Sequence, residues 1–320
     1  MLKTSRQLDI VTIAYDEEIK MLQMQARSIA LHVPAQLISS IIIIANDLQF
    51  RKFRKKFNKY ILPDYGPLQK MVQLIDGNTM IPIASREKGW VKQQILKLLA
   101  TQYVRSDYYL IMDAKNHFIR PVETTDLWDE DGKMYTPWSS LNMAFSQEFK
   151  NACTLFGVTA KPEFFQRAMS QSTPYLMSKD LIEQMIREIE CKSAKSFALA
   201  FLKDGPYTEF YLLYAYLLSK PGLFKTWYTY KKNINVTFWN PRTETHESLE
   251  ERSWRVSQPQ VRTLGVHRRY VKNMPDLSRQ TILNIWLEAG LLKSADEANY
   301  FMSLPKSPWQ QTKAWLKALF

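Results

Sequence analysis

Glycine is scarce in this chain, with nine in 320 residues, and no two of them form a Gly-x-Gly pair. The Gly-x-Gly-x-x-Gly fingerprint of dinucleotide-binding proteins is therefore absent, and so is the Gly-x-x-x-x-Gly-Lys-Ser/Thr loop that cradles phosphates. Any nucleotide that binds here must be held by charged side chains and by the loops at strand ends.

Cysteine is also rare, and its two positions carry no metal-binding pattern. Cys153 and Cys191 form neither a Cys-x-x-Cys pair nor a Cys/His cluster. This spacing predicts no structural zinc site and fits a reducing cytosolic environment. Neither thiol stands in the context of an activated nucleophile, and there is no Gly-x-Ser-x-Gly motif. A hydrolase with a serine or cysteine nucleophile therefore has little support.

No apolar run in the sequence is long enough to span a bilayer. The longest, residues 41–45 with its neighbours, is far shorter than the roughly 20 residues of a transmembrane helix. The N-terminus carries Lys3 and Arg6 and reaches Asp9 without a long apolar stretch. We therefore expect no secretory signal and a cytoplasmic protein. The net charge of +12 favours anionic partners such as nucleotide phosphates, nucleic acid or acidic lipid headgroups.

Strand-like and helix-like segments alternate through the first 113 residues. Short buried strands are predicted at residues 10–14, 41–45, 71–75, 80–84 and 108–113. Apolar residues at helical spacing predict helices after the first strand, over 50–60 and over 90–101. This alternation predicts an α/β fold, in which helices cover both faces of a mostly parallel sheet.

The pattern changes after residue 113. The dipeptide Asp131-Gly132 predicts a hairpin within residues 127–135, and Ser178 has the position of a helix N-cap. Late strands are predicted over 236–239 and 261–266, and the pattern is helical from Leu277 onward. We predict a catalytic domain over residues 1–275 and a C-terminal helical extension over 276–320.

Charged residues follow several of the predicted strands directly. Asp113 and Lys115 follow one strand, and Asp16 and Asp47 follow the first two. Ligands of open α/β sheets bind outside the carboxyl ends of the strands, so Asp113 and Lys115 are candidates for holding a substrate. Asp16 and Asp47 could contact a nucleoside, although an aspartate in such a position also caps turns, which explains them equally well.

Five segments carry a resemblance to a known family. They are residues 89–98, Asp113-Ala114-Lys115-Asn116, Thr173-Pro174-Tyr175, Glu209-x-x-Leu212-x-Tyr214 and His267-Arg268-Arg269. In this order they resemble bacterial GT-A-like glycosyltransferases, specifically a poorly characterised group found among surface-polysaccharide genes, over residues 8–272. The resemblance implies a GT-A-like sheet, a nucleotide-sugar donor, and a saccharide or lipid-linked saccharide acceptor in capsule, lipopolysaccharide or related glycan synthesis.

In that superfamily an Asp-x-Asp motif holds a divalent cation, but here Lys115 stands at the third position. A protonated lysine cannot ligate a cation, whereas its ammonium can neutralise phosphate. Either Lys115 replaces the metal, or Asp113 and His267 bind Mn²⁺ or Mg²⁺ beside it. We favour the first version and expect no metal cofactor, because Lys115, His267, Arg268 and Arg269 offer positive charge to a departing diphosphate. For residues 267–269, a solvated basic turn is the simpler interpretation.

The remaining candidates concern the acceptor and the nucleoside. Glu209 begins an apolar helix, where it can accept the proton of an acceptor hydroxyl or merely complement the helix dipole. A carboxylate that accepts the acceptor's proton would suit a displacement that inverts the anomeric configuration. The resemblance places Thr173 and Tyr175 beside the acceptor, although a proline-led helix entry with a packed tyrosine is the alternative. Gln94 and Lys97 lie one turn apart on the polar side of a helix, where we expect them to face solvent or the nucleotide.

Two surface features suggest contact with larger partners. Residues 50–60 interleave four aromatic with six basic residues, which suits an ordinary surface helix or an anionic membrane face. A stripe of C-terminal residues favours membrane binding, which we expect at the inner face of the plasma membrane. The stripe comprises Trp309, Thr312, Leu316, Leu319 and Phe320. The same charges would permit a basic nucleic-acid-binding protein without enzymatic activity. No RNP, KH or zinc-finger signature supports this alternative, so nucleic acid is not the favoured partner.

Overall fold

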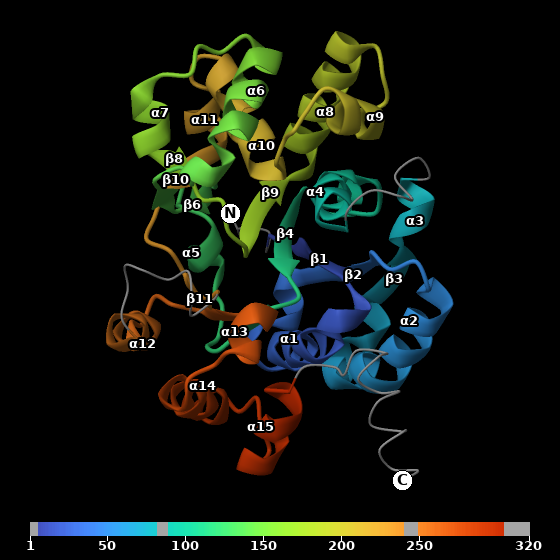
Figure 1. Ribbon diagram of the computed structural model, residues 1–320, viewed down its shortest axis with the longest axis vertical. Coiled ribbons are helices and arrows are strands. Elements are labelled where there is room, and N and C mark those ends of the chain that lie inside the picture. Colours follow the sequence, from blue (N-terminus) through green and yellow to red (C-terminus); the bar gives the residue numbers. More distant parts are fainter. Residues whose placement is uncertain (1–5, 82–88, 240–248, 304–320) are drawn as a thin grey trace, which may run out of the picture.

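The computed structural model describes residues 6–81, 89–239 and 249–303. A five-stranded sheet lies at its centre, in the order β3-β2-β1-β4-β9 (Figure 1). The bounds are Leu8–Ala14 for β1, Ile38–Ala45 for β2, Val72–Asp76 for β3, Tyr108–Asp113 for β4 and Tyr175–Ser178 for β9. The first four strands are parallel to their neighbours, and β9 is antiparallel to β4. The predicted α/β class with a mostly parallel sheet is confirmed.

The central strands are built from β-branched residues that are buried on both faces. All seven residues of β1 are buried, and Ile41–Ile44 of β2 are fully buried. Such residues have few accessible side-chain rotamers and pack well on a pleated surface. Asp9, Thr12 and Ser40 are buried polar residues within these strands. Further polar residues follow the strand ends, which places them together at one edge of the sheet.

Helices cover both faces of the sheet. Figure 1 shows α1 (Ile19–His32) on one face and α4 (Gly89–Leu99) on the other. The short α2 (Phe50–Lys56) continues as a π-helical turn, Phe57–Ile61, and α3 (Gly77–Met80) follows β3. The aromatic residues Phe53 and Phe57 are buried, while the basic residues between them are mostly exposed. The helix over 50–60 therefore packs as an ordinary surface helix.

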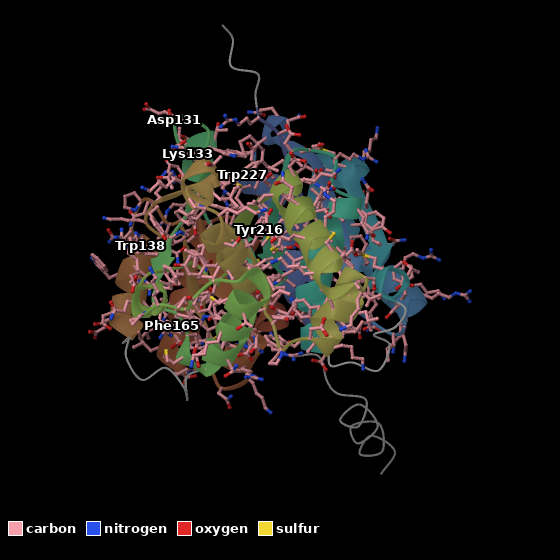
Figure 2. The ribbon with its side chains drawn as sticks, turned by 90° about the horizontal axis from the view of Figure 1, so that it is seen from above. Asp131, Lys133, Trp138, Phe165, Tyr216 and Trp227 are labelled. Carbon is pink, nitrogen blue, oxygen red and sulfur yellow. The ribbon has the colours of Figure 1, made fainter. Side chains whose placement is uncertain are left out.

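A mainly helical region lies beyond β9, at one end of the molecule (Figure 1). Its helices are α5 (Thr124–Leu127), α6 (Ser146–Phe156), α7 (Pro162–Gln166), α8 (Lys179–Ser193), α9 (Phe197–Lys203), α10 (Glu209–Ser219) and α11 (Leu223–Trp227). Its short strands are β6 (Met134–Thr136), β7 (Trp138–Ser139), β8 (Ala168–Met169) and β10 (Tyr228–Tyr230). Ser178 caps α8 as expected, by accepting from the backbone N–H of Leu181. In Figure 2, Tyr216 lies inside this region and Asp131 at its surface.

A second, smaller sheet joins the last helices to α1. Its strands are β5 (Asn116–Phe118), β11 (Asn235–Phe238) and β12 (Thr263–Val266), in the order β11-β12-β5. The helices beside it are α12 (Leu249–Ser257), α13 (Arg268–Lys272), α14 (Asp276–Glu288) and α15 (Ala295–Phe301). Trp286 of α14 is fully buried, and its Nε1–H donates to Nε2 of His117 over 2.6 Å. The predicted helices after Leu277 are thus present, while the division of the chain at residue 275 stays a prediction.

Two local predictions differ from the structure. Met80 ends α3 and is not in a strand, because the side chain of Asp76 accepts from the backbone N–H of Asn78 and starts a helical turn; residues 82–84 lie outside the described residues. The hairpin predicted at Asp131-Gly132 is reduced to one antiparallel bridge, between Trp128 and Met134, because β6 pairs in parallel with β10.

No helix within the described ranges combines the length and apolar character needed to cross a membrane. The predicted C-terminal stripe, from Trp309 to Phe320, lies outside the described residues.

The packing of Trp286 predicts a large loss of stability in Trp286→Ala. The substitution removes a buried indole and the donor to His117, so the free energy of unfolding should fall by about 3–5 kcal/mol in urea denaturation. Leu287→Ala in the same helix, where the leucine is 39% exposed, should change it by less than about 0.5 kcal/mol. Equal small effects of both variants would show that α14 is not part of the core.

Candidate active site

A cleft of about 950 Å³ opens at the carboxyl edge of the parallel strands, within the size range of sites for small molecules. Eleven of the twelve predicted site residues line it, all except Tyr175. Its walls come from the residues after β1, β2, β4 and β11, from the start of α4, from the loop before β9 and from the first turn of α10.

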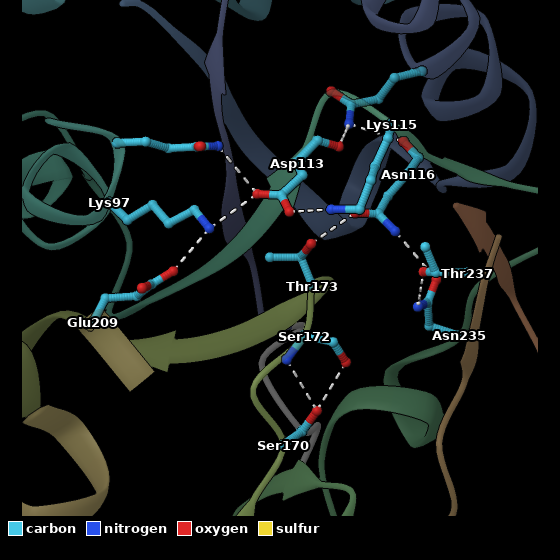
Figure 3. Close-up of polar contacts among 12 residues, drawn as sticks. Lys97, Asp113, Lys115, Asn116, Ser170, Ser172, Thr173, Glu209, Asn235 and Thr237 are labelled. Carbon is cyan, nitrogen blue, oxygen red and sulfur yellow. Dashed lines mark hydrogen bonds and ion pairs between the residues drawn. The ribbon is translucent and has the colours of Figure 1, made fainter. Parts of the chain in front are cut away.

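A buried group of charged side chains forms the floor of the cleft (Figure 3). Lys97 Nζ lies 2.9 Å from Oδ1 of Asp113 and 2.8 Å from Oε1 of Glu209. The other carboxylate oxygen of Asp113, Oδ2, accepts from Lys115 Nζ. The side chains of Lys97, Glu209 and Lys115 are all less than 10% exposed. Two carboxylates and two ammonium groups therefore meet where water is largely excluded.

This arrangement shifts the pKa values of its members in opposite directions. Burial alone would raise the pKa of Asp113, but the ammonium groups of Lys115 and Lys97 hold it well below its usual range. Burial likewise raises the pKa of Glu209, and Lys97 acts against that rise. Burial disfavours a charged Lys97, but Asp113 and Glu209 together raise its pKa above the usual value. Asp113 and Lys97 are thus ionised at neutral pH.

Of the two positions expected for Gln94 and Lys97, the one that faces solvent is wrong, and the one that faces the nucleotide stays a prediction. They are 5% and 3% exposed, because this side of α4 packs against the start of α10. Oε1 of Gln94 accepts from the backbone N–H of Glu209 over 3.4 Å. Both residues still line the cleft, but as part of its inner wall.

The basic segment at residues 267–269 lies on the rim of the cleft. His267 caps α13, with Nδ1 accepting from the backbone N–H of Arg269 over 3.2 Å. Burial, and then the charges of Lys115 and both arginines, lower the pKa of His267 to about 4. His267 is therefore neutral at pH 7, contrary to its expected cationic role, and with Nδ1 accepting, its Nε2 carries the hydrogen. The exposed Arg268 pairs with Glu17.

The two aspartates after the first strands lie at the edge of the cleft and have local partners. Both carboxylate oxygens of Asp16 accept from Lys56 Nζ over 2.6 Å. Asp47 accepts from the backbone N–H groups of Gln49, over 2.7 Å, and of Asp16, over 3.3 Å. The contact of Asp47 with Gln49 is the turn chemistry that the sequence allowed for, whereas Asp16 is held by an ion pair with Lys56. A nucleoside contact of either aspartate stays a prediction.

The acceptor role predicted for Tyr175 is not compatible with its position. Its ring is 3% exposed and packs against Phe210 and Tyr228, and its hydroxyl donates to Thr136. It lies on β9, inside the core, so no sugar can stack on it. Thr173 does line the cleft, but its hydroxyl donates to Oδ1 of Asn116 over 2.7 Å.

Several cleft residues were missed in the sequence. Glu18 lies in the short 3-10 turn Asp16–Glu18, and its Oε2 is buried without a hydrogen-bond partner among the described residues. Trp90 stacks on Phe145 with ring centroids 5.8 Å apart, and Trp239 lies 4.5 Å from Lys115 Nζ. The run Asp16-Glu17-Glu18 directly after a buried strand was the available signal for Glu18.

The donor set at the floor does not fit a divalent cation. Both oxygens of Asp113 accept from ammonium groups, and Nδ1 of His267 accepts from a backbone N–H. Within the described ranges, no three histidine, cysteine or acidic side chains are grouped as metal ligands. Hard cations need several free oxygen ligands, and Lys97 and Lys115 would repel the ion.

Residues 7–252 match a sequence family described as a family of unknown function, DUF6492. The chain belongs to this family. No curated protein matches it in sequence.

Three solved glycosyltransferase structures are similar to the DUF6492 chain in backbone. One is the galactosyltransferase LgtC in complex with donor and acceptor sugar analogues, at 15% identity and a TM-score of 0.49, over 90% of this chain and 97% of LgtC. Apo GlyE of Streptococcus pneumoniae TIGR4 is similar at 13% identity and a TM-score of 0.48, over 91% of this chain and 62% of GlyE. The bifunctional WbbM, in its apo form, is similar at 13% identity and a TM-score of 0.48, over 88% of this chain and 52% of WbbM.

The environment of Glu18 predicts a pH-dependent effect of Glu18→Gln. Burial, and then the charge of Asp113, raise the pKa of Glu18 from 4.5 to about 7. A raised pKa in the folded state means that stability is lost as pH rises from about 4.5 through 7, when a buried carboxylate must ionise. Glu18→Gln should therefore melt at a higher temperature than the unsubstituted protein at pH 8, and at a similar temperature at pH 5.

Glu163→Gln, in the exposed part of α7 outside the cleft, is the matched control and should show no such pH-dependent difference. An equal effect of Glu18→Gln at both pH values would show that the carboxyl does not titrate in this range.

Proposed function

We propose that this protein is a glycosyltransferase, which transfers a sugar from a nucleotide-sugar donor to a saccharide or lipid-linked saccharide. Bacterial capsule, lipopolysaccharide or a related surface glycan is the proposed product. The observation that carries the proposal is the Asp113-Lys115 pair, which lies at the end of β4 inside a cleft with an arginine-bearing rim. The motif order that resembles GT-A-like enzymes supports the same chemistry.

The donor diphosphate would lie between Lys115 and the rim. Lys115 can move from Asp113 to a phosphate oxygen, and Arg268 and Arg269 can add charge-assisted hydrogen bonds. The Nε2–H of the neutral His267 can donate a further hydrogen bond. As the bond between the anomeric carbon and the diphosphate oxygen breaks, these donors would stabilise the charge that develops on the leaving group.

Glu209 is the proposed proton acceptor on the acceptor side of the cleft. The acceptor hydroxyl oxygen would form the new bond to the anomeric carbon, and its proton would pass to the carboxylate. Burial strengthens Glu209 as a base by raising its pKa. A single displacement of this kind inverts the anomeric configuration.

The exposed basic residues of α2 support a peripheral position at an anionic membrane, where a lipid-linked acceptor would be found. Arg51, Lys52, Arg54 and Lys55 all face solvent, and each cation near such a surface contributes about 1 kcal/mol to binding. Residues 304–320 form no part of this support.

The proposed base predicts separate effects of Glu209→Gln on binding and on transfer. Nucleoside diphosphates and nucleotide sugars should raise the melting temperature of both forms, because a ligand of the folded state stabilises it. Transfer by the variant should fall at least about 100-fold, the usual contribution of general base catalysis. Glu163→Gln should keep both properties.

Unchanged transfer by Glu209→Gln would contradict the assignment of Glu209 as the base, but not the proposed enzyme. No stabilisation by any nucleotide, together with tight and salt-sensitive binding to unrelated RNA oligomers, would overturn the proposed enzyme and favour the nucleic-acid-binding alternative.

The charges at the floor also predict that transfer does not need a divalent cation. Initial rates measured with EDTA should equal those measured with added MnCl₂ or MgCl₂, because lysine and arginine side chains supply the positive charge. Activity that is lost in EDTA and restored by manganese would contradict this.

A further inference from the structure

The position of Lys97 differs from that of Lys115 in one respect. Lys97 Nζ contacts two carboxylates, 2.9 Å from Asp113 and 2.8 Å from Glu209 (Figure 3). Lys115 contacts Asp113, and its Nζ lies 4.5 Å from the centre of the Trp239 ring. The carboxylates come from the end of β4 and from the first turn of α10. Lys97 is therefore a bridge between two anionic groups that the fold brings together.

Two largely buried carboxylates that contact the same ammonium group require a positive charge or a proton between them. Like charges in a buried site disfavour each other's ionisation, and Asp113 does raise the pKa of Glu209. With both acids and both lysines ionised, the charges of Asp113, Glu209, Lys97 and Lys115 sum to zero. Adding a divalent cation would leave an excess of two positive charges at a floor whose side chains are less than 20% exposed.

We propose that the ammonium group of Lys97 occupies the place between Asp113 and Glu209 that a divalent cation would otherwise take. The cleft consequently binds the diphosphate of its ligand without a metal. The binding of a diphosphate rests on the proposed function. The exclusion of the cation does not, because it depends only on the protein's own residues.

Removal of the ammonium group should create a cation site. Lys97→Met keeps an apolar stem of similar shape, removes the terminal ammonium group and leaves a net charge of −1 at the floor. Magnesium and manganese sites commonly use one or two carboxylates with water or phosphate oxygens. The vacated space between Asp113 and Glu209 would supply such a pair.

The test measures melting temperatures with MnCl₂ alone and with MnCl₂ plus inorganic pyrophosphate. Lys97→Met should melt about 2–4 °C higher when the ion is present at ten times its dissociation constant. The unsubstituted protein and Lys97→Arg, which keeps the positive charge, should not respond to the ion. Pyrophosphate should stabilise the unsubstituted protein equally in EDTA and in MnCl₂.

Two further measurements keep the proposal falsifiable if Lys97→Met folds poorly. Refolding of the variant in MnCl₂ should restore its circular dichroism, and Lys97→Met/Glu209→Gln, which is neutral at the floor again, should fold without a response to manganese. Manganese that stabilises the unsubstituted protein as much as Lys97→Met, or a folded Lys97→Met that ignores manganese, would overturn the proposal. Failure of pyrophosphate to bind under any condition would instead count against the proposed function.

Discussion

The ammonium group of Lys97 joins Asp113 and Glu209, and the floor of the cleft depends on this contact. A buried ion pair contributes little net stability, because both charges lose their hydration, but removal of one partner costs about 3–5 kcal/mol. Once α4 places Lys97 below the end of β4, α10 must begin where it supplies the second carboxylate. The interaction therefore fixes the helical region relative to the parallel sheet, and with it the width of the cleft.

The turn between β4 and β5 depends on a second set of contacts. Nε2 of Gln25 in α1 donates to the backbone oxygens of Asp113, over 2.8 Å, and of Asn116, over 2.9 Å. Asn116 in turn accepts from Thr173 and donates to Asn235, over 3.2 Å. The side chain of Asn116 thus connects the turn to the loop before β9 and to β11 of the smaller sheet. The polar atoms of Thr173 and Asn116 are used to hold the floor in place; Thr173 lines the cleft, whereas Asn116 is fully buried.

The sequence allowed prediction of those features that depend on residues close together along the chain. The runs of isoleucine and valine predicted β1 and β2, the change from apolar to charged residues located Asp113 and Lys115, and Ser178 marked the start of α8. Lys97 looked exposed because its helix has a polar side there, and the partner that buries it, Glu209, is 112 residues away. The interior position of Tyr175 has the same origin, since Phe210 and Tyr228 cover it. Contacts of this range have no signature in local periodicity.

The net charge of +12 is not located at the floor of the cleft. There the charges of the two lysines and the two acids cancel, and His267 is neutral at pH 7. Among the described residues that line the cleft, the exposed cations are Arg268 and Arg269 on its rim, which can attract an anion from solution. Inside, Lys115 can leave Asp113 for a phosphate oxygen only if another cation continues to neutralise that carboxylate. Lys97 meets this condition, because its contact with Asp113 is on the other carboxylate oxygen. In the proposed enzyme the two lysines would have separable roles: Lys97 would keep Asp113 ionised and in place, while Lys115 follows the diphosphate.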